Sequence, residues 1–154
     1  MPKHVYHIAE INIGRILEPL DSPMMAEFTN NLDQINALAD GSPGFVWRLV
    51  GEGNDASSLR PFDDDMIIVN MSVWESVEAL HTYVYKSHHT DFLRWRKEWF
   101  SKMTESHFCM WWVRAGHEPT VREAKEHLEH LRVHGETATA FTFKTLFPAP
   151  GEDK

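Results

Sequence analysis

The chain has 154 residues, the usual size of one domain, and its 42% hydrophobic and 25% charged residues are ordinary for a globular protein. The formal charge of −8 argues against a nucleic-acid surface, because phosphate binding needs clustered Lys and Arg. No apolar run reaches the roughly 18 residues of a transmembrane helix, and the N-terminus lacks the apolar core of a signal peptide. The single cysteine, Cys109, cannot form an internal disulfide, so we expect a cytoplasmic protein.

The first part of the chain predicts a strand, a helix and a second strand. β-Branched residues in partial alternation indicate a strand over residues 5–13. Ser22 followed by Pro23 is a typical helix start, and apolar residues at spacings of three and four continue to residue 39. A turn at 42–44 then leads into a strand over 45–50, which a long polar loop follows.

The remainder predicts two strands, helices that cover them, and an additional helix and strand. Ser76 is expected to cap one helix, and Thr120 with Glu123 forms a capping box in which Glu123 reaches back. The residues 86–89 are expected to interrupt the first of these helices. In chain order, the expected elements are a strand over 66–74, a helix from 77, a helix over about 90–103, a strand over 107–113, a helix from 121 that ends before 135, and a strand over 139–147.

The element order is therefore β-α-β-β-α-β with an appended C-terminal helix and strand. The first six elements are those of the ferredoxin-like, split βαβ arrangement, so the predicted class is α+β. We expect a single domain over residues 1–147 and a C-terminal tail over 148–154.

Tracts such as Ser42-Pro43-Gly44-Phe45, Trp74-Glu75-Ser76 and Ser87-His88-His89 carry a family resemblance. The chain resembles the DUF3291 family and, more widely, the dimeric α/β-barrel superfamily that includes the antibiotic-biosynthesis monooxygenases. In the wider group, a Trp-Glu-Ser tract ends the third strand and a Ser-x-His step follows, as in Trp74-Glu75-Ser76 and Ser87-His88-His89. The tracts that resemble DUF3291 are Ala9-Glu10-Ile11-Asn12, Ser42-Pro43-Gly44-Phe45-Val46-Trp47-Arg48-Leu49, Arg60-Pro61-Phe62-Asp63-Asp64-Asp65, Val69-Asn70-Met71-Ser72-Val73-Trp74-Glu75-Ser76, Arg96-Lys97-Glu98-Trp99-Phe100 and Trp111-Trp112-Val113 with Ala115-Gly116-His117 and Pro119-Thr120.

The resemblance implies a homodimer and an enzyme that acts on a small apolar or aromatic molecule. The reactions it implies are oxygenation without a dedicated cofactor, isomerisation or cyclisation. One branch of the superfamily degrades haem with a Trp three residues before, and a His seven residues after, the position of Ser87. Those two positions hold Val84 and Arg94 in this chain, so the haem-degrading pair is absent.

A polar row on the third strand is the first candidate for chemistry. Alternation places Asn70, Ser72 and Trp74 on one face of the strand and the apolar residues between them on the other. An aromatic wall with a few orienting hydrogen-bonding groups is typical of a small-molecule pocket. The alternative is that the polar residues lie on a solvated face or at a dimer seam.

Histidine and arginine residues could supply the reactive groups. His89 lies at a predicted helix break and could act as a general base, since an unperturbed imidazole titrates near neutrality. Arg96 could hold a carboxylate or phenolate, and with Asn70 these form the expected catalytic set. The alternative is that His89 caps a helix and Arg96 pairs with a surface carboxylate. The residues expected to bind the substrate are Trp74, Ser72, Trp99, Trp47, His7 and Asn12.

No cofactor and no metal site are predicted. The acidic run 63–65 and the helix stripe of Glu123, His127, His130 and His134 are better explained as solvated surfaces, and Cys109 as an ordinary strand residue. The alternative function is a haem- or metal-dependent enzyme that uses His7, His89 or His107 as a ligand. A non-catalytic, ligand-binding or stress-response dimer is a third possibility.

Aromatic residues on the strands support the predicted homodimer. A ferredoxin-like sheet leaves one face uncovered by its own helices, and Trp47, Trp111 and Trp112 would then form a large exposed patch. Besides a second copy, the expected partner is a small-molecule substrate.

Overall fold

The structure is a computed structural model, and it describes residues 5–17, 22–23, 26, 37–49, 67–88, 100–101 and 107–150. The predicted helix over 22–39 lies mostly outside these residues, although residues 37–40 form a helical turn that ends at Gly41. The labelled elements are β1 (Tyr6–Ile16), β2 (Phe45–Arg48), β3 (Ile67–Trp74), α2 (Val77–His88), β4 (Phe100–Ser101), β5 (Phe108–Arg114) and α4 (Val121–His134).

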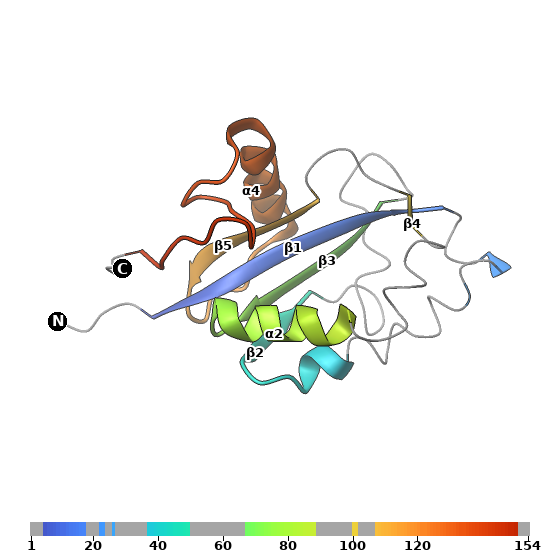
Figure 1. Cartoon of the computed structure of the whole chain (residues 1–154), viewed down its shortest axis with the longest axis horizontal. Coiled ribbons are helices and arrows are strands. Elements are labelled where there is room, and N and C mark those ends of the chain that lie inside the picture. Colours follow the sequence, from blue (N-terminus) through green and yellow to red (C-terminus); the bar gives the residue numbers. More distant parts are fainter. Residues whose placement is uncertain are drawn as a thin grey trace.

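The strands form one antiparallel sheet around the long strand β1 (Figure 1). One edge of β1 pairs with β3, which in turn pairs with β2. The other edge pairs with β5 along residues 6–12 and with β4 at residues 15–16. The order β2-β3-β1-β5 is that of the ferredoxin-like fold, which confirms the predicted α+β class.

The period of two along β1 sends alternate side chains into two separate cores. Ala9, Ile11 and Ile13 pack with α4, whereas Ile8 packs with α2. The two helices accordingly lie on opposite sides of the sheet, as Figure 1 shows. We call these sides the α4 face and the α2 face.

Each helix begins at the hydroxyl cap that the sequence predicts. Ser76 Oγ accepts a hydrogen bond from the Ala79 backbone N–H at 3.0 Å, and Thr120 Oγ1 accepts one from that of Glu123 at 3.0 Å. The Glu123 carboxylate does not reach back to Thr120, because it binds His117 and Trp111 instead. Within the described part of the chain, no helix combines the length and the apolar character needed to cross a membrane.

Three predicted elements differ from the structure. The helix α2 continues without a break to His88, through most of the stretch expected to interrupt it. The expected helix over 90–103 is wrong at its end, since Phe100 and Ser101 pair with β1, which extends to Ile16 and so offers its edge there. The last strand over 139–147 is reduced to a single bridge between Met110 and Phe141.

The segment 136–149 crosses the free edge of β5, passing from α4 to the α2 face. The Met110 and Phe141 backbones exchange two hydrogen bonds, and Trp112 Nε1–H donates to the Phe147 carbonyl at 2.9 Å. Phe141 is fully buried, and Phe143 stacks on Phe108. The segment therefore completes the core of the α2 face rather than extending the sheet.

Candidate functional site

Side chains of neighbouring strands form three cross-strand rows on the α2 face. Because β1 pairs with both β3 and β5, residues in register lie side by side across the sheet. We name them the aromatic row, the carboxyl row and the amide row. Read from β3 through β1 to β5, they are Trp74–Ile8–Trp112, Ser72–Glu10–Met110 and Asn70–Asn12–Phe108.

The carboxyl row contains a directed chain of hydrogen bonds. Trp74 Nε1–H donates to Ser72 Oγ at 2.8 Å, and the Ser72 hydroxyl donates to Glu10 Oε2 at 2.6 Å. Among the described residues, Glu10 and Ser72 are the buried polar ones, with 4% and 5% exposure. A carboxyl group held in an apolar core by a hydroxyl is costly for folding, and such groups cluster at functional sites.

The surroundings of Glu10 change its acidity strongly. Burial raises the pKa of Glu10 from 4.5 to about 8, because the charged form loses its hydration. Hydrogen bonds from the Ser72 side chain and backbone lower the pKa, but by less than burial raises it. Glu10 is therefore mostly protonated at pH 7 and can exchange its proton near neutrality.

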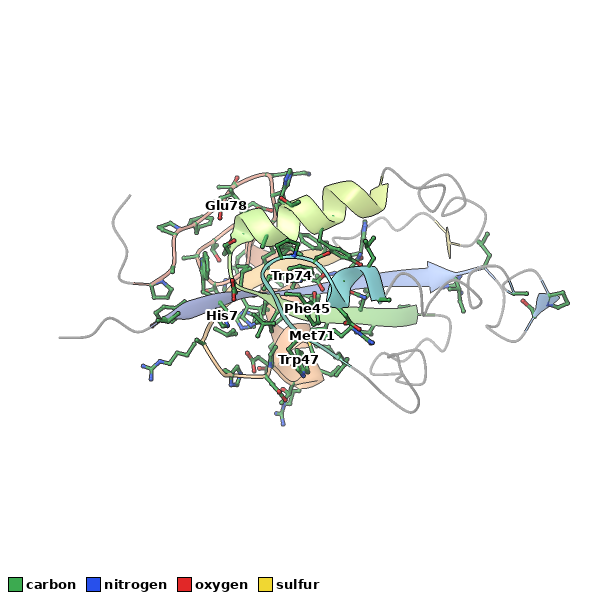
Figure 2. All side chains as sticks on the ribbon, turned by 90° about the horizontal axis from the view of Figure 1, so that it is seen from below. His7, Phe45, Trp47, Met71, Trp74 and Glu78 are labelled. Atoms are coloured by element: carbon green, nitrogen blue, oxygen red, sulfur yellow. The ribbon has the colours of Figure 1, made fainter. Side chains whose placement is uncertain are left out.

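Aromatic rings from α2 and β2 close one end of the site. Tyr83 stacks on Trp74 with ring centroids 5.0 Å apart, and Phe45 meets the same indole edge-on at 5.4 Å. Figure 2 shows Phe45 beside Trp74 under α2. Burial, and then the charge of Glu10, raise the pKa of Tyr83 to about 12, so its phenol stays protonated.

Arg48 extends the carboxyl row onto β2, where it pairs with Ser72. Its Nε donates to Asp40 Oδ1 at 2.8 Å and its Nη2 to Asp40 Oδ2 at 3.3 Å, which fixes the plane of the guanidinium group. The Arg48 side chain is 10% exposed, whereas that of Asp40 is 47% exposed. One row thus holds a cation and an ionisable carboxyl on either side of Ser72.

The exposure of the polar residues changes along β1 and β3. Trp74 is fully buried, Glu10 and Ser72 are nearly so, Asn12 is half-buried and Asn70 is exposed. The amide row is therefore the open end of the site, and its amides could orient a carbonyl or hydroxyl group of a ligand.

The structure brings together part of the predicted set. Asn70, Ser72, Trp74 and Asn12 share the α2 face. His7 and Trp47 do not join them, since their register with Val113 and Val73 places both on the α4 face. His89, Arg96 and Trp99 lie outside the described residues.

Trp74 has another role in the structure than the predicted aromatic wall. Its ring is fully buried by Tyr83 and Phe45, so it supports the site from beneath. Sequence reasoning did not select Glu10, Tyr83 or Arg48. The available signal was Glu10 itself, a charged residue between the apolar positions 8, 9 and 11 of a strand.

His117, which precedes α4, and His127 on α4 lie with Glu123 and Trp111 in a separate cluster on the α4 face. His117 Nε2 lies 2.8 Å from Glu123 Oε1, and Trp111 Nε1–H donates to Glu123 Oε2 at 3.2 Å. His127 stacks on Trp111, and its Nδ1–H donates a hydrogen bond to the Thr139 carbonyl at 2.8 Å. Burial lowers the pKa of His127. The described residues contain no group of three or more His, Cys, Asp or Glu placed to hold a metal ion.

Cys109 lies on the α4 face in a strand core, as predicted for an ordinary cysteine. Burial raises the pKa of its thiol far above the usual range. The thiolate is therefore not formed near neutral pH, and Cys109 contributes no nucleophile.

Comparison with known proteins identifies one family. Residues 7–154 match the family model described as domain of unknown function (DUF3291), and no curated protein matches the chain. Among solved structures, the chain is similar to SnoaB, a cofactor-independent oxygenase from Streptomyces nogalater, with 16% identity and a TM-score of 0.46 over 75% of this chain and 96% of that chain. It is also similar to the NE2512 protein of unknown function from Nitrosomonas europaea, with 9% identity and a TM-score of 0.47 over 77% of this chain and 97% of that chain.

Proposed function

We propose that this protein, which belongs to the DUF3291 family, is an enzyme that moves a proton on a small, mostly apolar or aromatic substrate. Glu10 is the acid–base group. The observation that carries the proposal is its buried carboxyl, with a pKa of about 8, in the carboxyl row beside the amide row, where Asn70 is exposed to solvent.

The acidity of Glu10 suits proton transfer at physiological pH. General acid–base catalysis is most efficient when the pKa of the catalytic group lies near the working pH. An ordinary surface glutamate is a weak base for a carbon acid, because its carboxyl group has a pKa of only about 4.5 and its charge is well solvated. Glu10 instead forms its carboxylate in an apolar core, where the carboxylate is a stronger base and the protonated form persists near neutrality.

A suitable substrate has a hydrogen made acidic by a neighbouring carbonyl group or aromatic ring. Glu10 accepts that proton, and the amide row of Asn12 and Asn70 orients the carbonyl oxygen on which negative charge develops. His89 and Arg96 stay predictions in this scheme, as a second proton carrier and a holder of the anion.

Three reactions can follow proton removal. Return of the proton from Glu10 to another carbon gives an isomerisation, and attack of the carbanion on an internal carbonyl gives a cyclisation. Reaction with O2 instead gives a hydroperoxide, which loses water to leave a ketone, so one CH2 and one O2 become one C=O and one H2O. This last reaction is an oxygenation that needs no dedicated cofactor.

The proposal is tested with 2-tetralone, an aromatic ketone with enolisable hydrogens, by following their exchange for deuterium by NMR. We expect the wild-type protein to accelerate exchange over buffer, with a rate that rises as pH increases through about 8. Glu10→Gln keeps the shape but cannot accept the proton, so the acceleration should fall by about 100-fold or more. An oxygen electrode shows whether O2 is consumed in the same mixture.

Glu78→Gln is the matched control, because Glu78 is an exposed glutamate at the start of α2 (Figure 2). Its exchange rate should equal that of the wild type. Exchange that persists in Glu10→Gln, or is lost equally in Glu78→Gln, would contradict the assignment of Glu10.

A further inference from the structure

We propose that Trp74 is a positioning residue: its indole N–H fixes the Ser72 hydroxyl so that the single hydroxyl hydrogen points at Glu10. This inference rests on the proposed function, since it explains how the acid–base group is held. It concerns a fully buried residue that acts on Glu10 through Ser72.

The donor and acceptor inventory gives the chain its direction. An indole nitrogen can only donate, so Trp74 occupies a lone pair of Ser72 Oγ over 2.8 Å. A serine hydroxyl has one hydrogen, and Ser72 donates it to Glu10 Oε2 over 2.6 Å. The Ser72 hydroxyl is thereby held as a donor to Glu10.

The neighbours of Trp74 hold the indole in this orientation. Tyr83 stacks on one side at 5.0 Å with an interplanar angle of 25°, and Phe45 meets the ring at 81°. The ring is therefore clamped between α2 and β2, and its N–H cannot turn away from Ser72 without moving one of them.

Comparison with two other tryptophans separates this role from ordinary hydrogen-bond satisfaction. A buried indole N–H needs an acceptor, and Trp112 meets that need with the Phe147 carbonyl and Trp111 with the Glu123 carboxylate. Trp74 instead donates to a hydroxyl that passes the interaction on to a carboxyl group. Among these three tryptophans, only Trp74 can influence Glu10 through a bonded chain.

Removal of the indole N–H should change the acidity of Glu10 in a defined direction. A Ser72 hydroxyl without that donor can turn and accept a hydrogen bond from the protonated carboxyl group, which favours the neutral form. The pKa of Glu10 should therefore rise. Among the described residues, the other titratable or charged groups that interact with Glu10 or its neighbour Tyr83 are Tyr83 on α2, Arg48 on β2, Asp40 before it and Cys109 on β5. The substitution leaves all of them in place.

The test follows the carboxyl carbon of Glu10 by NMR in protein labelled at its glutamate carboxyl groups, with Glu10→Gln to identify the signal. We expect Trp74→Phe to raise the titration midpoint by about 0.5–1 unit, the effect of one neutral hydrogen bond. Trp112→Phe removes an indole N–H from the same core and should leave the midpoint unchanged. In a Ser72→Ala background, Trp74→Phe should cause no further shift, because its effect passes through Ser72.

An unchanged midpoint in Trp74→Phe, or the same shift with and without Ser72, would overturn the inference. The wild-type protein offers a second readout that needs no core substitution. The Trp74 indole N–H resonance should titrate with the midpoint of Glu10 while that of Trp112 does not, and an unresponsive Trp74 signal would also overturn it. If the Trp74 signal titrates with Glu10 but the protein does not accelerate hydrogen exchange in 2-tetralone, the positioning role of Trp74 is supported and the proposed function is rejected.

Discussion

The buried carboxyl group of Glu10 lowers the stability of the folded state. Its neighbours on β1 are apolar, and the residue is only 4% exposed on the α2 face, so the carboxyl group has lost nearly all contact with water. In the described part of the chain, the Ser72 hydroxyl and backbone offset part of that loss, and the pKa of Glu10 stays raised because burial has the larger effect. A residue that costs folding free energy at this position is expected to have a functional reason.

The pH dependence of stability is the first prediction at this scale. The pKa of Glu10 is about 8 in the folded state and 4.5 for an ordinary glutamate, so the folded state holds an extra proton between these values. Its contribution to the free energy of unfolding is complete below pH 4.5 and is lost as pH rises through 8. The upper bound of that loss is about 5 kcal/mol, at about 1.4 kcal/mol per pKa unit.

Urea unfolding at pH 5 and pH 9 measures this loss. Glu10→Gln cannot ionise, so its stability relative to the wild type should increase from pH 5 to pH 9. Glu78→Gln, with an exposed side chain, should follow the wild type at both pH values. An equal pH dependence in the wild type and Glu10→Gln would refute the raised pKa.

At the scale of elements, local signals were more reliable than long-range ones. Ser76 and Thr120 cap helices as predicted, because capping depends on residues a few positions apart. The strand β4 forms because β1 extends to Ile16 and pairs with Phe100 and Ser101. The single bridge at Phe141 forms because this segment meets Met110 on the edge of β5. Both depend on contacts between distant residues, which a local sequence pattern does not predict. The same limit explains why Asn70, Ser72 and Trp74 could be grouped from alternation, whereas their partner Glu10 could not.

The seating of α2 against the turn before β2 gives a second prediction. Gly44 has φ +83°, and an added Cβ would lie 2.5 Å from the Cβ of Ala79 on α2. Gly44→Ala should therefore destabilise the protein by about 2–4 kcal/mol, through both the backbone conformation and the steric clash. Denaturant unfolding measures the change.

Gly116→Ala separates these two contributions. Gly116 has φ +93°, but nothing lies within 4 Å of its added Cβ. Gly116→Ala should lower the free energy of unfolding by only about 1 kcal/mol, because the backbone conformation alone is affected. Equal losses in the two variants would show that α2 does not pack closely on Gly44.

At the scale of the whole molecule, helices on both faces of the sheet alter the argument for a homodimer. Trp111 is covered by α4 and Trp112 lies on the α2 face. The exposed patch expected from Trp47, Trp111 and Trp112 is therefore not formed. The helix α4 packs on β5 and β1, and Trp47 with Leu49 and Ile67 stays only partly buried toward the β2 edge of the α4 face. Those residues are where we expect a second copy to bind.

Sedimentation velocity at micromolar concentration tests the homodimer, which stays a prediction. We expect the mass of two chains for the wild type and a larger dissociation constant, by about 10-fold or more, for Trp47→Ala, since interface tryptophans contribute strongly to binding. Val133→Ala is the control, because Val133 is exposed on α4 away from that edge. A wild type that sediments as one chain would refute the homodimer.

The titration midpoint of the Glu10 carboxyl group shows whether this residue can act as an acid–base group near neutral pH. Carboxyl-carbon NMR of the wild-type protein, with the signal identified by its absence in Glu10→Gln, reports that midpoint without any assumption about substrate. We expect a midpoint of about 8. A midpoint near 4.5, the value of an ordinary glutamate, would contradict it.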